Sequence, residues 1–225
     1  MKPVIGLITI GQSPRDDITT DLSEIWQERI EIMEIGALDD LTEEEIIELK
    51  PDKKETLLVS RLRNGLSVEL AEERLNPLLV EKIRILENQV QLIFLMCTGE
   101  FTGLNAKVPL IQPDPILRNT VKGLLQADQT LGIMVPEKEQ VSNMERIWSK
   151  YVDNNIVVEF GSPYGELSLI KEGALKLKEK GAQLIVLDCM GYNKVMKGVV
   201  SSITEKPVIL PRTLVARIIQ ELVNF

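Results

Sequence analysis

Two stretches of the chain repeat each other: Gln91–Gly99 reads QLIFLMCTG, and Gln183–Gly191 reads QLIVLDCMG. Six of the nine positions are identical, and Phe94 and Val186 form a conservative apolar pair. The second copy begins 92 residues after the first, about the length of one small α/β lobe. Because repetition at a fixed offset is the sequence signature of repeated structural units, we expect two related halves.

Short apolar runs mark the strands of both halves. Runs without polar alternation are typical of strands buried on both faces, and segments of helical periodicity such as Glu166–Lys180 separate them. The runs are Val4–Ile10, Glu31–Ile35, Thr56–Ser60, Leu92–Met96, Leu131–Val135, Ile156–Phe160, Leu184–Leu187 and Val208–Leu210. This alternation predicts an α/β fold of two pseudo-symmetric lobes, each a short parallel sheet flanked by helices, with a ligand cleft between them. We place residues 1–115 and 208–225 in the first lobe and 116–207 in the second.

Composition narrows the class of protein. The 225 residues carry a formal net charge of −8, which argues against nucleic acid as a partner because phosphate binding needs clustered Lys and Arg. The apolar runs fall short of the ~20 residues of a membrane span, so we expect a cytoplasmic protein without a membrane partner. Histidine is absent, which excludes a Ser-His-Asp triad, a Cys-His dyad and a His-based metal site. We expect no metal.

The two cysteines, Cys97 and Cys189, each follow an apolar run within the repeated stretches. In parallel sheets ligands bind beyond the carboxyl ends of strands, where both cysteines would lie. A thiol ionises closer to neutral pH than most other bases, so two opposed thiols can act on a carbon between them. A single Cys at a strand end is more often a small buried hydrophobic residue. Two at equivalent positions of a repeat favour the functional interpretation, and a redox disulfide is the third alternative.

Three motifs carry a resemblance to a known family. They are ITIGQSPRDD at Ile8–Asp17, MCTGEF at Met96–Phe101 and DCMGY at Asp188–Tyr192. Together they resemble the AroM family, a branch of the aspartate/glutamate/hydantoin racemase superfamily. The resemblance implies two α/β lobes around a cleft, with the last helix returning to the first lobe. It also implies cofactor-independent racemisation, isomerisation or decarboxylation of small carboxylates.

The sequence departs from better understood racemases beside both cysteines. Thr98 stands where those enzymes typically carry Asn or a similar polar residue after the first cysteine. Met190 and Gly191 stand where they often carry Thr and His after the second. The departures leave the substrate and the reaction type open.

A second candidate element is Gly11-Gln12-Ser13-Pro14-Arg15, after the first apolar run. Ser13 suits a helix N-cap and Pro14 the first helical position, so this turn can offer N–H groups and a guanidinium to an anion. The alternative is an ordinary strand–helix turn with Arg15 paired to Asp16 or Asp17. The remaining candidates for contact with substrate are Thr98, Gly99, Glu100, Asp188, Gly191 and Tyr192, and a capping or solvated role is the alternative for the carboxylates.

The leading hypothesis is a cofactor-independent racemase or isomerase for a small, amino-acid-like carboxylate, with Cys97 and Cys189 as catalytic residues. A non-catalytic carboxylate-binding protein and a decarboxylase or isomerase with one working cysteine are the alternatives. The expected partner is the small-molecule substrate, and a homodimer is left open.

Overall fold

A computed structural model of the chain describes residues 2–27 and 29–223; residues 1, 28, 224 and 225, which fall in the expected first lobe, lie outside the described residues. The fold divides into two compact units, residues 1–114 with 216–225, and residues 115–215. We expected the chain to return to the first lobe at residue 208, but it rejoins the first unit at residue 216. Strand β10 (Val208–Ile209) pairs with β9 (Leu184–Leu187) and so belongs to the second sheet.

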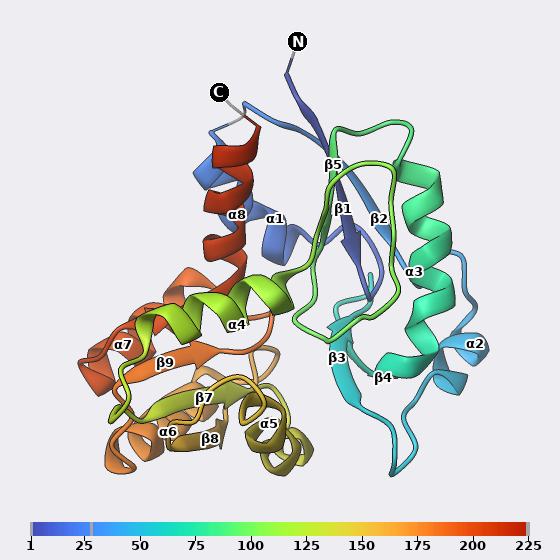
Figure 1. Cartoon of the computed structure of the whole chain (residues 1–225). Coiled ribbons are helices and arrows are strands. Elements are labelled where there is room, and N and C mark those ends of the chain that lie inside the picture. The colour runs from blue at the N-terminus through green and yellow to red at the C-terminus, as the bar shows by residue number, and fades with distance from the viewer. Residues whose placement is uncertain (1, 28, 224–225) are drawn as a thin grey trace. The chain divides into compact units, whose positions relative to one another are not determined.

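The first unit is built on a parallel sheet, whose described strands number four (Figure 1). In spatial order they are β2 (Glu31–Gly36), β1 (Val4–Thr9), β5 (Leu92–Leu95) and β6 (Leu110–Ile111). Figure 1 shows helix α3 (Glu72–Leu86) on one side of this sheet and α1 (Asp16–Trp26) on the other. The last helix, α8 (Pro211–Leu222), ends against α1, where Trp26 Nε1 donates to the carbonyl of Ala216 over 2.9 Å.

The second unit repeats the same strand order. Its described strands form the parallel series β8 (Ile156–Phe160), β7 (Leu131–Val135), β9 and β10. In both units the strand that comes first in the chain stands second in the sheet. The next parallel strand is added on one side of it, and the later strands are added on its other side. The strand order therefore reverses between β1 and β5 and between β7 and β9. Such a reversal point is where parallel α/β sheets bind ligands. The helices are α4 (Pro113–Leu124), α5 (Val141–Trp148), α6 (Leu167–Glu179) and α7 (Lys194–Thr204), with a short 3-10 turn at Lys138–Gln140.

Burial on both faces explains the unbroken apolar runs. In β9, Ile185 and Leu187 join a core with α6 and α7, whereas Leu184 and Val186 join a second core with α4 and α5. Successive side chains of a strand point to opposite faces, so a strand covered on both sides needs apolar residues throughout. The expected α/β class with two helix-flanked parallel sheets is thus confirmed.

Some elements differ from the sequence analysis. The run Thr56–Ser60 becomes β3 (Leu57–Arg61), which pairs antiparallel with β4 (Ser67–Ala71) in a hairpin outside the parallel sheet. Helix α2 (Glu43–Glu48) does not differ: it begins with a capping box at Thr42 and Glu45, which the sequence Thr42-Glu43-Glu44-Glu45 itself indicates. The hairpin is a local addition to the first unit. Among the described residues, no helix is both long and apolar enough to cross a membrane.

Candidate active site

The two cysteines lie in turns of matching backbone geometry. Cys97 follows β5 and Cys189 follows β9, so each stands at the carboxyl end of the strand beside its sheet's reversal point. The Cys97 amide donates to Leu95 O over 2.9 Å, and the Cys189 amide donates to Leu187 O over 2.8 Å. The internal repeat of the sequence is therefore a repeat of local structure.

Each sulfur accepts a hydrogen bond from the glycine two residues later. Gly99 N lies 3.3 Å from Cys97 Sγ, and Gly191 N lies 3.3 Å from Cys189 Sγ. A backbone N–H aimed at a sulfur favours negative charge on it. Neither cysteine is in a disulfide, and the two residues are 7% and 9% exposed respectively, so each turn keeps its cysteine mostly out of solvent. The turns are suited to hold a thiolate.

Glu72 lies over the first cysteine turn. It is the first residue of α3, and its Oε2 accepts from Glu100 N over 3.1 Å. Burial raises the pKa of Glu72 to about 7, and the negative charges of Glu73, Glu100 and Asp114 add to this, while the hydrogen bond from Glu100 N acts in the opposite direction. Thr98 is half-buried and Glu100 is exposed. Near neutral pH this turn thus has a carboxyl group poised to exchange a proton.

Tyr164 takes the corresponding place at the second turn. It follows β8, and its hydroxyl lies 3.9 Å from Cys189 Sγ. Arg212, in the first turn of α8 and completely buried, donates from Nε to Met190 O over 2.9 Å. The Cys189–Gly191 turn is therefore held by a phenol on one side and a guanidinium on another.

Asp188 and Tyr192 are engaged inside the second unit. Asp188 Oδ2 accepts from Trp148 Nε1 over 2.8 Å, and the guanidinium of Arg118 lies 4.1 Å from the centroid of the Trp148 ring. Tyr192 is completely buried and its hydroxyl donates to Gly161 O over 2.8 Å. Burial raises the pKa of Tyr192, with the charges of Cys189 and Asp188 adding to it. Both side chains are buried on either side of Cys189 in the chain and tie the turn to the rest of the second unit.

The Gly11–Arg15 segment is bound within its own unit. The amides of Gly11 and Gln12 donate to Thr9 Oγ1 and Arg61 O, over 3.2 and 3.1 Å. Ser13 donates from both its amide and its hydroxyl to Asp39, over 2.8 and 2.6 Å. A carboxylate of the chain thus stands where an external anion was expected.

The helix start also differs from the expectation. Helix α1 begins at Asp16, not after Ser13, and the Ser13–Pro14 peptide bond is cis. The N-cap residue, Arg15, makes no side-chain capping bond, and its amide donates to Glu34 Oε1 over 2.7 Å. Ser13 lies two residues before the N-cap position, and its hydroxyl is bound to Asp39 instead.

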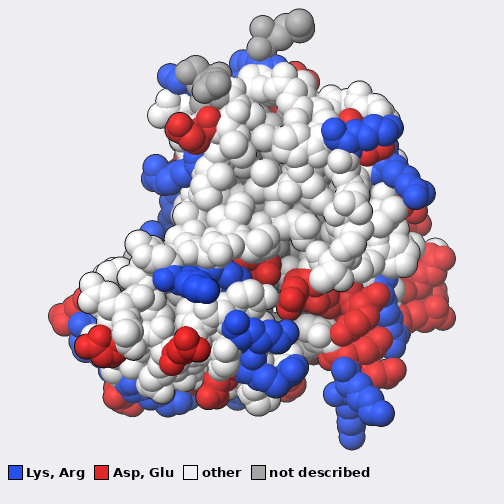
Figure 2. Space-filling model, in the orientation of Figure 1, with Lys and Arg blue, Asp and Glu red and all other residues white. Residues whose placement is uncertain are grey.

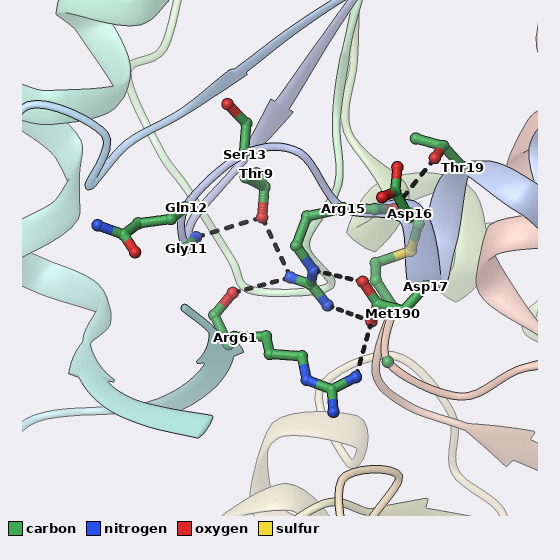
Figure 3. Close-up of polar contacts among 12 residues, drawn as sticks. Thr9, Gly11, Gln12, Ser13, Arg15, Asp16, Asp17, Thr19, Arg61 and Met190 are labelled. Carbon is green, nitrogen blue, oxygen red and sulfur yellow. Dashed lines mark hydrogen bonds and ion pairs between the residues drawn. The ribbon is translucent and has the colours of Figure 1, made fainter. Parts of the chain in front are cut away.

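Arg15 lies beneath this segment rather than at its edge. It is 3% exposed, and its guanidinium makes a two-pronged pair with Asp17, with N–O distances of 2.8 and 2.9 Å (Figure 3). Its Nη1 donates to Thr9 Oγ1 and Ser60 Oγ over 3.2 and 3.1 Å. The pairing with Asp17 is one of the two alternatives that the sequence left open. The place of Gly11, Gln12, Ser13 and Arg15 in a substrate site stays a prediction.

Acidic side chains gather on the first unit. Figure 2 shows them where α2 lies and α3 begins, segments that carry Glu43, Glu44 and Glu45, and Glu72 and Glu73. Among the described residues, no group of three or more Cys, Asp or Glu is placed to hold a metal ion.

The sequence did not indicate Glu72 or Arg212 as site residues. Glu72 and Arg212 lie 25 and 23 residues from the cysteines that they serve, so only folding brings them to the turns. Tyr164 follows an apolar run, and that position was the only sequence signal for it.

Comparison with known proteins places this fold. The sequence model of the family described as AroM protein matches residues 5–223. The chain belongs to the AroM family. No curated protein was found to match the chain.

Solved structures with the same fold include racemases and an isomerase. The glutamate racemase from Francisella tularensis, in complex with D-glutamate, superposes with a TM-score of 0.60 at 15% identity, over 98% of this chain and 81% of that one. The allantoin racemase from Pseudomonas fluorescens gives 0.60 at 13% identity, over 98% and 90%. The maleate isomerase Iso from Pseudomonas putida S16 gives 0.62 at 10% identity, over 97% and 92%. The AroM chain thus has the racemase-type fold, as the sequence motifs predicted.

Proposed function

We propose that this AroM protein is a cofactor-independent racemase or isomerase for a small, amino-acid-like carboxylate, with Cys97 and Cys189 as opposed acid and base. The observation that carries the proposal is the matching pair of turns, in which each sulfur accepts an N–H 3.3 Å away at the carboxyl end of a strand. The same fold in enzymes named as glutamate racemase, allantoin racemase and maleate isomerase supports the choice of reaction class.

The chemistry requires one thiolate and one thiol. The thiolate removes the α-proton from one face of the substrate, and the thiol donates its proton to the opposite face. The product has the opposite configuration, and the two cysteines have exchanged protonation states. Turn N–H groups and the exclusion of water would stabilise the carbanion formed between these steps.

Of the other candidate site residues, Thr98 and Glu100 have side chains that solvent reaches. We assign them direct contact with substrate. Asp188 and Tyr192 are buried and bound to Trp148 and Gly161, and we assign them to the support of Cys189.

The proposal is tested by exchange of α-protons with solvent. Wild type, Cys97→Ser and Cys189→Ser are incubated in D2O with a panel of small amino and hydroxy acids, and deuterium incorporation is followed by NMR for each enantiomer. Serine cannot ionise usefully at neutral pH without a base, and the chain has no His to supply one. Each single variant should lose net turnover yet exchange the α-proton of one enantiomer only, and the two variants should choose opposite enantiomers.

Ser168→Ala, an exposed change in α6, is the control and should match wild type. Near-normal turnover in either cysteine variant would contradict the two-base scheme and favour a single working cysteine, as in a decarboxylase. No exchange by any protein across the panel would favour a carboxylate-binding protein without catalysis.

A further inference from the structure

In each cysteine turn, an ionisable side chain from another part of the chain packs closely against the glycine. A Cβ at position 99 would lie 2.8 Å from Glu72 Oε2, and a Cβ at position 191 would lie 2.6 Å from the hydroxyl oxygen of Tyr164. Neither glycine has a positive φ, so close approach rather than backbone conformation requires glycine here. The two turns match in backbone but differ in the group that covers them.

The second turn carries a hydroxyl group and a cation. The Tyr164 hydroxyl lies 3.9 Å from Cys189 Sγ, and the buried guanidinium of Arg212 binds the carbonyl of the next residue, Met190. The acidic groups here are Asp188, held by the Trp148 indole, and Glu137, whose charge acts on the buried phenol Tyr192. A hydroxyl near a sulfur, and a cation bound to the carbonyl of the following residue, favour the ionised form of that sulfur.

The first turn carries acids. The Glu72 carboxyl binds the Glu100 amide, two residues beyond Thr98, and the charges of Glu73, Glu100 and Asp114 converge on it. These groups come from α3, the turn itself and the start of α4. Negative charge near a thiol opposes its ionisation.

We propose that Tyr164 and Glu72 are positioning residues that make the two cysteines unequal, so that Cys189 is the thiolate and Cys97 the thiol in the resting protein. This inference rests on the proposed function, in which one base and one acid are needed. In that scheme the resting protein first deprotonates the enantiomer whose α-hydrogen faces Cys189, and Cys97 supplies the proton to the other face.

The test is the pH dependence of alkylation, which needs no substrate. The Cys97→Ser protein reports on Cys189 and the Cys189→Ser protein reports on Cys97. The rate of reaction with iodoacetamide is measured by mass spectrometry from pH 5 to 10. The Cys189 rate should reach half its plateau at a pH at least about one unit below that for Cys97, the size of one hydrogen bond to a charged group. Comparing half-plateau pH values removes the effect of unequal access.

Isosteric substitutions then test whether Tyr164 and Glu72 cause the difference in half-plateau pH between the two cysteines. Tyr164→Phe, in the Cys97→Ser background, should raise the half-plateau pH of Cys189 by about one unit, whereas the control Tyr151→Phe should not. Glu72→Gln, in the Cys189→Ser background, should lower the half-plateau pH of Cys97, whereas Glu81→Gln, an exposed change in the same helix, should leave it unchanged.

The outcomes separate this inference from the proposed reaction. Equal half-plateau pH values, or a lower value for Cys97, would overturn the inference even if the wild type racemises a substrate. The predicted order, together with both isosteric shifts, supports it. If the half-plateau pH values follow the predicted order but no α-proton exchanges with solvent, the difference between the two thiols stands and the proposed racemase reaction is contradicted.

Discussion

Glu72→Gln should change how the stability of the first unit depends on pH. The pKa of Glu72 is raised from 4.5 in the unfolded chain to about 7 in the folded one, mainly because the carboxyl is partly buried. Below pH 4.5 the carboxyl is protonated in both states, so it contributes its full relative stabilisation there. As pH rises through 7 the folded carboxyl must ionise within its acidic surroundings, and that stabilisation is lost.

The size of the effect follows from the two values. A difference between 4.5 and about 7, at about 1.4 kcal/mol for each pH unit, corresponds to about 3 kcal/mol. Solvent reaches part of the half-buried side chain and screens it, so we expect about 1–3 kcal/mol. Glutamine keeps the shape of the side chain and its acceptor for Glu100 N but does not titrate, so the variant lacks this dependence.

Urea unfolding at pH 5 and pH 8 measures the pH-dependent contribution of Glu72 to the free energy of unfolding. The free energy of unfolding of wild type, minus that of Glu72→Gln, should fall by about 1–3 kcal/mol between the two pH values. Burial also raises the pKa of Glu34, but this group is common to both proteins and cancels in the difference. Identical pH dependence in the two proteins, or an equal effect of the exposed control Glu81→Gln, would refute the reasoning.

Two further predictions concern single residues. Arg15→Ala should lower the free energy of unfolding by about 2–4 kcal/mol, because it removes the 3%-exposed guanidinium that makes the two-pronged pair with Asp17 and donates to Thr9 and Ser60; an unchanged urea midpoint would contradict this. Gly191→Ala should displace Tyr164 and abolish turnover, because its Cβ would lie 2.6 Å from the phenol oxygen, and wild-type activity would argue against the packing described. The control Gly198→Ala, in α7 with open space around its Cβ, should retain activity and unfold up to about 1 kcal/mol less readily.

The central strands could be predicted from sequence because they are buried on both faces. Unbroken runs such as Leu131–Val135 leave few alternatives to a covered strand, and the repeated Gln–Gly stretches revealed the internal symmetry. The hairpin β3–β4 was missed because Leu57–Arg61 has the same apolar character, although its partner is an adjacent antiparallel strand.

Helix α7 was also missed, and its composition explains why. Lys194–Thr204 is rich in β-branched residues and contains Gly198, all weak helix formers. The helix forms because Asn193 caps it, accepting from Met196 N over 3.0 Å, and because Val200 packs into the core with α6. Tertiary packing here overrides local propensity.

At the candidate site, sequence indicated the cysteines but not the side chains around them. Cys97 and Cys189 were recognisable because the repeat surrounds them. The groups that distinguish the two turns, Glu72 and Tyr164, come from separate elements and carry no motif of their own. The sequence left the role of Arg15 open because a buried ion pair and an anion-binding arginine have the same signature at a helix start.

A crystal structure of the protein tests the central claim most directly, by the distance between the sulfurs of Cys97 and Cys189. One carbon centre between two bases, each at a near-attack distance of about 3–3.5 Å, requires sulfurs roughly 6–9 Å apart. We predict that both sulfurs open onto one cleft at that separation. Sulfurs in separate cores, or on opposite faces of the molecule, would contradict the account.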